Sequence, residues 1–132
     1  MTTLFDSSII IALFRINETH HKQAVKIFMQ ESNIIILDFV LSEVLTVLKM
    51  REGHNVAKKC YKYLTNHQKI HILKTSRAQF QTALEYFYKN ENRLSIVDTL
   101  LYVISRTSTS FSNRTDSDMK LVTFDKDLFK LI

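Results

Sequence analysis

The chain has 132 residues, 45% of them hydrophobic and 23% charged, so it is long enough to bury a core, and we expect residues 1–132 to form a single domain. Its one cysteine, Cys60, excludes an internal disulfide and fits a reducing compartment. No apolar run approaches the ~20 residues of a membrane span, and residues 7–14 lack the basic flank and cleavage site of a signal peptide, so we expect a cytoplasmic protein without a membrane partner.

The whole chain carries a net charge of +5. Positive charge is concentrated in the middle of the sequence. Residues 49–74 contain one acid, Glu52, and seven basic residues, which are Lys49, Arg51, Lys58, Lys59, Lys62, Lys69 and Lys74. Such a face can follow a phosphate backbone without reading its sequence. A solvated helix face has the same composition, and the stretch by itself favours that simpler interpretation.

Strand-like and helix-like segments alternate along the first half of the chain. The pattern predicts a strand over residues 4–5, helices over 7–15 and 20–29, a strand over 34–37, and helices over 40–51 and 55–65. The second helix has Ala24, Ile27 and Phe28 on its inner face. The continuous apolar run that forms the second strand is typical of a strand buried on both faces in a parallel sheet. Gly53, the only glycine, lies where the third helix should end.

The second half continues the alternation. The pattern predicts a strand over residues 70–73, a helix around 80–87, a helix over 96–104, a polar loop over 107–120, a strand over 121–124 and a short closing helix. Phe80, Ala83, Leu84 and Phe87 have the spacing of a helix with one apolar face. The helix over 96–104 is apolar nearly all round, so it should be the buried central helix. An α/β fold follows, in which helices cover a parallel sheet.

Four acids follow the predicted strands or open predicted helical runs. Asp6 follows the first strand and Asp125 the last, and ligands of open α/β sheets bind at that carboxyl edge. Glu43 and Asp98 begin apolar helical runs that can bring them to the same edge. Carboxylates without a matching cysteine or histidine indicate a hard divalent cation and hydrolysis of phosphate esters.

Each acid also has a purely structural interpretation. Asp6 and Asp125 are good helix N-caps, Ser95 with Asp98 resembles a capping box, and Glu43 would be a first-turn acid favoured by the helix dipole. The group as a whole is harder to explain in this way. Like charges ~4 Å apart repel by ~4 kcal/mol at an effective dielectric near 20, and an unpaired carboxylate on a buried helix is costly. A bound divalent cation resolves both problems.

In their order and spacing these motifs resemble the PIN domain family, and more closely the VapC-type ribonuclease toxins of type II toxin-antitoxin systems. The resemblance is carried by Leu4-Phe5-Asp6-Ser7-Ser8, Leu41-Ser42-Glu43-Val44, Leu94-Ser95-Ile96-Val97-Asp98 and Val122-Thr123-Phe124-Asp125-Lys126-Asp127-Leu128. It implies a Rossmann-like parallel β-sheet flanked by α-helices, with Mg²⁺ or Mn²⁺ as the cofactor. The implied catalytic and metal-binding residues are Asp6, Glu43, Asp98 and Asp125.

The same resemblance implies an endoribonuclease that hydrolyses RNA and is regulated by a cognate antitoxin with a DNA-binding N-terminal half. Ser7 and Thr123 match hydroxyl positions that orient such a site, and Asp127 stands where some members have a further acid. Tyr102 departs from the small residues usual there, and Asp38 is expected to be a turn or cap acid. The alternative is a non-catalytic PIN-like module that binds RNA or protein, against which the retention of all four acids argues.

The early helices also predict a homodimer. Their apolar residues offer more surface than one small sheet can cover, and exposed apolar patches mark interfaces. These residues are Ile9, Ile10, Leu13 and Phe14 on the first helix and Val47 and Met50 on the third. The resemblance to VapC-type toxins implies the same assembly.

Overall fold

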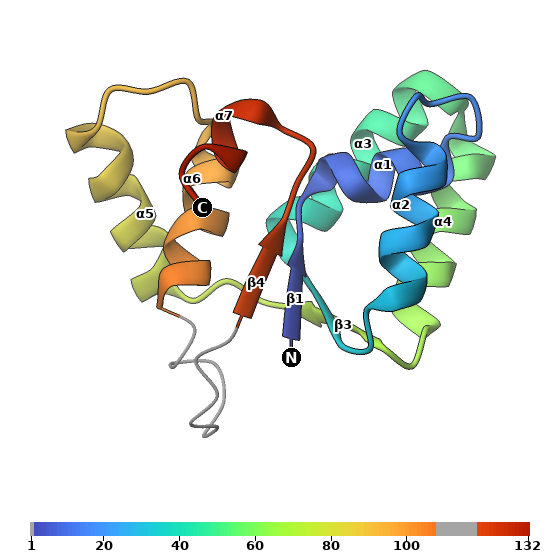
Figure 1. Ribbon diagram of the computed structural model, residues 1–132, viewed down its shortest axis with the longest axis horizontal. Coiled ribbons are helices and arrows are strands. Elements are labelled where there is room, and N and C mark those ends of the chain that lie inside the picture. Colours follow the sequence, from blue (N-terminus) through green and yellow to red (C-terminus); the bar gives the residue numbers. More distant parts are fainter. Residues whose placement is uncertain (1, 108–118) are drawn as a thin grey trace.

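The computed structural model describes residues 2–107 and 119–132 (Figure 1). In chain order these residues form β1 (Thr2–Phe5), α1 (Ser7–Phe14), α2 (His21–Gln30), β2 (Ile34–Leu37), α3 (Asp38–Glu52), α4 (His54–Asn66), β3 (Ile70–Leu73), α5 (Arg77–Lys89), α6 (Ile96–Arg106), β4 (Met119–Val122) and α7 (Lys126–Phe129). The predicted alternation of strands and helices is confirmed. The predicted polar loop lies largely outside the described residues.

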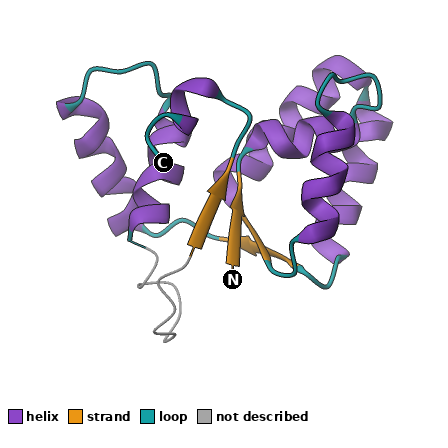
Figure 2. Ribbon diagram, in the orientation of Figure 1, coloured by secondary structure: helices purple, strands orange, loops and turns teal. Residues whose placement is uncertain are grey.

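The strands form one parallel sheet in the order β3-β2-β1-β4. Helices α1, α2 and α4 lie on one side of the strands, and α5, α6 and α7 lie on the other (Figures 1 and 2). The chain adds β2 and β3 on one side of β1 and then crosses to place β4 on the other side. The strand order therefore reverses between β1 and β4, which is the point where open α/β sheets bind their ligands.

The core matches the apolar runs of the sequence. Ile34, Ile36 and Leu37 of β2 are fully buried, as expected for a strand covered on both faces. No residue between 96 and 104 is exposed, which confirms α6 as the buried helix. Cys60 lies inside the core, where burial raises the pKa of its thiol to about 12. None of the described helices is long and apolar enough to cross a membrane.

The apolar surface expected on α1 is largely absent. Ile9 and Ile10 are completely buried, because α1 packs against both α2 and α3. Leu13 and Phe14 are half-buried, and Met50 of α3 is 82% exposed. The expectation that Ile9 and Ile10 offer surface to a partner is therefore wrong.

Helix α5 is less buried than its apolar stripe predicted. Ala83 is fully buried, but Leu84 is 38% and Phe87 50% exposed. The reason is the position of α5 at the outside of the fold, where α6 is its main neighbour within the described chain. Phe80 instead stacks on Phe39 of α3, with ring centroids 5.4 Å apart.

The basic stretch forms the solvent-facing side of α4 and the ends of α3 and β3. Every basic residue in it is exposed except Lys69, which lies over the Phe28 ring, 4.0 Å from its centroid, and donates a hydrogen bond to the Phe28 carbonyl. Between α3 and α4, Gly53 has φ +95° and lies at the predicted helix end. The basic side chains therefore lie mainly along α4 and the end of α3, while Lys74 directly follows β3 at the carboxyl edge of the sheet.

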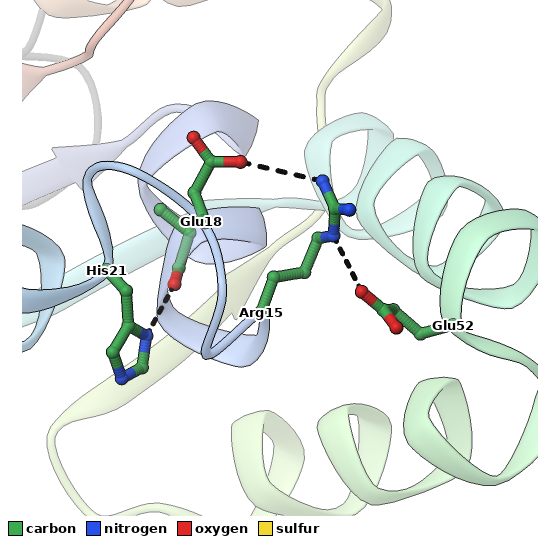
Figure 3. Close-up of polar contacts among 5 residues, drawn as sticks. Arg15, Glu18, His21 and Glu52 are labelled. Atoms are coloured by element: carbon green, nitrogen blue, oxygen red, sulfur yellow. Dashed lines mark hydrogen bonds and ion pairs between the residues drawn. The ribbon is translucent and has the colours of Figure 1, made fainter.

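Polar contacts fix the loop between α1 and α2 (Figure 3). The Arg15 guanidinium donates to the Glu52 carboxylate at 2.8 Å and contacts Glu18 at 3.5 Å. The His21 ring contacts the Ala12 carbonyl oxygen through Nδ1, at 2.8 Å. The loop is thus attached both to the end of α3 and to α1, which sets the position of the start of α2.

Candidate active site

The ends of β1 and β4 bring two of the predicted acids to the switch point of the sheet. Asp6 directly follows β1 and is only 2% exposed. The last strand was expected over residues 121–124, but β4 ends at Val122. The reason is that β1 ends at Phe5, the partner of Val122, so no strand remains for later residues to pair with. Asp125 therefore lies in a loop beyond the strand rather than at its end.

Two hydroxyl groups join the loops that carry Asp6 and Asp125. Thr123 Oγ1 donates to Asp6 Oδ2 at 2.5 Å and accepts from the Asp125 backbone N–H at 2.9 Å. Ser8 Oγ donates to Asp6 Oδ2 at 3.0 Å and accepts from the Phe124 backbone N–H at 2.9 Å. These bonds hold the Asp6 carboxylate in one orientation and replace the strand pairing that ended at Val122.

Ser8 is a site residue that the sequence did not reveal. The predicted hydroxyls, Ser7 and Thr123, both contact the acids, since Ser7 donates its backbone N–H to Asp6 at 2.7 Å and its side chain bonds to Glu43. Ser8 follows Asp6 by only two positions, but a serine inside an apolar helix start has no distinguishing pattern. Its role depends on the approach of the loop after β4, which is a tertiary contact.

Glu43 lies on the exposed side of α3, at the rim of the site. Helix α3 starts at Asp38, so Glu43 is in its second turn, and the first-turn explanation for this residue is wrong. Partial burial raises the pKa of the Glu43 carboxyl; the Ser7 hydrogen bond opposes this effect, and the charges of Asp6 and Asp98 add to it. These effects indicate that the carboxylates of Asp6, Glu43 and Asp98 lie near one another.

Asp98 is half-buried in the first turn of α6. It forms the predicted capping box: its N–H donates to Ser95 Oγ at 3.0 Å, and its carboxylate accepts from the Ser95 N–H at 3.2 Å. Burial is the main cause of the raised pKa of Asp98, and the charges of Asp6 and Asp125 raise it further. The Asp98 side chain therefore caps α6 and also lies within the electrostatic influence of Asp6 and Asp125.

Asp125 caps α7, as its structural interpretation predicted. Its Oδ1 accepts from the N–H groups of Asp127 and Leu128 at 2.9 and 3.0 Å. Asp38 has a structural role in its own helix, since its carboxylate accepts from the Thr75 hydroxyl at 2.7 Å and from the Thr75 N–H at 3.2 Å. It joins the start of α3 to the segment after β3, as expected of a turn or cap acid.

Comparisons with known proteins identify the family of this fold. Residues 3–132 match the PIN domain model. The chain belongs to the PIN domain family. A search of the curated proteins finds no match to it.

Two solved structures show the same fold as this PIN domain. VapC20 of Mycobacterium tuberculosis, a toxin that cleaves the sarcin-ricin loop, is 18% identical, with a TM-score of 0.83 over 97% of this chain and 93% of that one. VapBC2 of Rickettsia felis, bound to a DNA fragment from its promoter, is 12% identical, with a TM-score of 0.66 over 99% of this chain and 93% of that one. At these identities the likeness is one of fold.

The four carboxylates of this PIN domain are the type of ligand that a hard cation prefers, although in this structure they accept hydrogen bonds from N–H and O–H groups. Within residues 2–107 and 119–132, no three carboxylate, imidazole or thiol groups lie close enough to hold a metal ion. Ion pairs in this part of the chain join Arg15 to Glu18 and Glu52, and Lys120 to Glu31, so none neutralises the four acids. Carboxylate oxygens suit Mg²⁺ or Mn²⁺, which would draw the carboxylates away from their caps.

Proposed function

We propose that this PIN domain is a metal-dependent endoribonuclease, the toxin of a toxin-antitoxin pair, which hydrolyses RNA phosphodiester bonds. The observation that carries the proposal is the electrostatic proximity of the four acids at the switch point of the sheet, without a basic partner in the described part of the chain. The fold shared with VapC20, itself an RNA-cleaving toxin, supports this assignment.

In this proposal Asp6, Glu43, Asp98 and Asp125 hold the cation. When bound, Mg²⁺ or Mn²⁺ would neutralise charge on the phosphate and make a water molecule more acidic. Thr123 and Ser8 fix the Asp6 carboxylate, so that its orientation does not depend on the substrate.

A cleavage assay with matched variants tests the activity. The wild-type chain should cut single-stranded RNA in Mg²⁺ or Mn²⁺ and lose activity in EDTA. Asp6→Asn and Asp98→Asn should each reduce cleavage by at least about a hundredfold, since a ligand of the cation is neutralised. Asp38→Asn is the control, because its carboxylate binds Thr75 rather than the other acids. Cleavage by Asp98→Asn at the wild-type rate would show that the assigned site is wrong.

One observation favours the alternative of a non-catalytic module that binds RNA or protein: the described carboxylates are not preassembled around a metal position. Such a module would bind RNA with equal affinity in Mn²⁺ and in EDTA and leave it intact. The endoribonuclease should instead yield products with defined ends that disappear on chelation. Product analysis by gel electrophoresis separates the two functions.

We further propose an antitoxin partner with a DNA-binding N-terminal half and a disordered tail that folds on this chain. The supporting observation is again the group of acids without a cation, because a guanidinium can meet a carboxylate through two hydrogen bonds and exclude the metal. Titrating Mg²⁺ or Mn²⁺ into the inhibited complex should restore cleavage, and less metal should suffice when the tail's arginines are replaced by alanine. Equal inhibition by both tails would exclude this mode of blockade.

A homodimer in the cytoplasm completes the proposal. With Ile9 and Ile10 in the core, the predicted interface residues that keep some exposed surface are Leu13, Phe14, Val47 and Met50. Light scattering at micromolar concentration should give twice the mass of one chain. A monomer in that measurement would leave the nuclease proposal intact and refute the assembly.

A further inference from the structure

A pocket of about 420 Å³ shares a wall with the group of acids. It lies between the start of α2, the loop after β4 and helix α7. Besides Thr123, the lining residues are His20, Gln23, Phe124, Lys126, Phe129 and Lys130. Thr123 bonds to the Asp6 carboxylate, and Phe124 stands directly between Thr123 and Asp125 in the chain. A molecule in this pocket would therefore lie next to the acids.

An aromatic pair forms one wall of the pocket. The rings of His20 and Phe124 stack with their centroids 4.7 Å apart and their planes 26° from parallel. His20 is exposed, while Phe124 is half-buried against the core. The ring of Phe129, 63% exposed, adds a second aromatic surface. Stacked rings with an open face suit nucleobases, because every base has a flat π-surface.

The pocket is held in place from both sides. The His20 carbonyl accepts from the N–H of Ala24, so His20 is the N-cap residue of α2, and the neighbouring His21 is attached to α1 (Figure 3). On the other side, the Phe124 backbone N–H donates to Ser8 Oγ. A preformed wall loses little conformational entropy when a ligand binds, so these contacts favour binding.

The charge of the pocket is positive. Lys126 is the first residue of α7, and Lys130, four positions later, is its C-cap residue with a helical backbone, so their side chains lie on the same side of the helix. Both are exposed, neither takes part in an ion pair with another described residue, and no acid lines the pocket. Two free ammonium groups beside stacked rings suit a single-stranded nucleic acid, which offers phosphates and unstacked bases together.

We propose that this pocket binds one nucleotide of a single-stranded RNA, beside the phosphate that would be hydrolysed at the acids. The base stacks on His20 and Phe124, the adjacent phosphates meet Lys126 and Lys130, and the Gln23 amide is in place to hydrogen-bond a base edge. The inference rests on the proposed ribonuclease function and specifies where its substrate lies. It also implies that the basic residues on α4 form an ordinary solvated helix face and do not bind the substrate RNA.

The electrostatic part of the inference predicts a change in salt dependence. Binding of a fluorescent single-stranded RNA of about 12 nucleotides is measured by anisotropy at several salt concentrations, in an Asp98→Asn background that prevents cleavage. The slope of the logarithm of the binding constant against the logarithm of the salt concentration is negative. Substituting Lys126→Gln and Lys130→Gln together should make this slope shallower by about 1.4, since each phosphate contact to a single strand contributes about 0.7. The control, Lys59→Gln with Lys62→Gln on α4, makes the same change in net charge and should alter the slope by less than about 0.5.

The stacking part is tested with Phe124→Leu in the same background. Leucine keeps the apolar contact with the core and removes the ring, so affinity for the single strand should fall on the order of tenfold while the salt slope stays the same. Affinity for a duplex of the same sequence should not change, because its bases are not open to stacking. Phe87→Leu, at a 50% exposed ring on α5, is the control, and thermal unfolding confirms that each variant is folded.

The inference and the proposed function fail in different ways. If the wild-type chain cleaves RNA while both pocket variants bind the single strand as tightly as the Asp98→Asn parent, the pocket is not the substrate site and the ribonuclease proposal stands. RNA affinity would also be unchanged in both pocket variants if the pocket bound a protein segment instead, and this outcome too would overturn the inference. If the wild-type chain neither binds nor cleaves RNA, the proposed function fails and the inference fails with it.

Discussion

The Thr123 hydroxyl is the contact on which the geometry of the site most depends. It donates to Asp6 Oδ2 at 2.5 Å and accepts from the Asp125 N–H at 2.9 Å. Thr123→Val keeps the shape of the side chain and removes both hydrogen bonds. Loss of a bond to a charged group costs about 1.5–3 kcal/mol, and the Asp125 N–H left without its acceptor adds about 1 kcal/mol. Ser8 still donates to Asp6, so we expect the free energy of unfolding to fall by about 2–4 kcal/mol in total.

Urea denaturation in metal-free buffer measures this change, and two variants control for it. Thr123→Ser retains the hydroxyl and should lose less than about half as much stability. Thr99→Val removes another buried hydroxyl, whose one bond to the described residues is to the Ser95 carbonyl at 2.9 Å, and should cost at most about 1 kcal/mol. If Thr123→Val were no more destabilising than Thr99→Val, the hydroxyl would not hold the acid, and the reasoning about the site would be refuted.

Three further outcomes are expected. The raised pKa values of Glu43 and Asp98 mean that these groups stabilise the fold fully below their ordinary pKa and lose that contribution as pH rises through the raised values. Without metal, Asp98→Asn should therefore be at least as stable as wild type at neutral pH. Mn²⁺ should raise the wild-type melting temperature more at neutral pH than near pH 4. An equal rise of the melting temperature at both pH values would contradict this. Gly53→Ala should cost about 1–3 kcal/mol in a urea titration, because φ +95° with ψ 168° strains any residue with a Cβ, and a change below about 0.5 kcal/mol would show that α3 and α4 can relax. Asp38→Ala should lower the free energy of unfolding by about 1–3 kcal/mol through its lost bonds to Thr75 yet leave RNA cleavage at the wild-type rate, and a loss of cleavage in a folded variant would give Asp38 a part in the site.

The structural interpretations of three of the four acids are confirmed, while their shared metal site stays a proposal. Asp6, Asp98 and Asp125 cap α1, α6 and α7 as their local sequence indicated. Asp6 and Asp125 also lie at one edge of the sheet, because each follows the end of a parallel strand, whereas Asp98 stands at the start of α6, which follows α5. For Glu43 the local interpretation was wrong, since α3 begins earlier than its apolar pattern indicated. A helix start depends on where the preceding strand ends, and β2 ends immediately before Asp38.

The sequence by itself determined the order of strands and helices, because hydrophobic periodicity and capping residues act between near neighbours along the chain. It also suggested the chemistry of the site, a hard cation held by four acids, and this part stays a prediction. The end of β4, the role of Ser8 and the pocket beside Phe124 were decided only by the tertiary structure. Each of them depends on contacts between residues far apart in the chain, such as Ser8 with Phe124 and His20 with Phe124, and no local pattern encodes those distances.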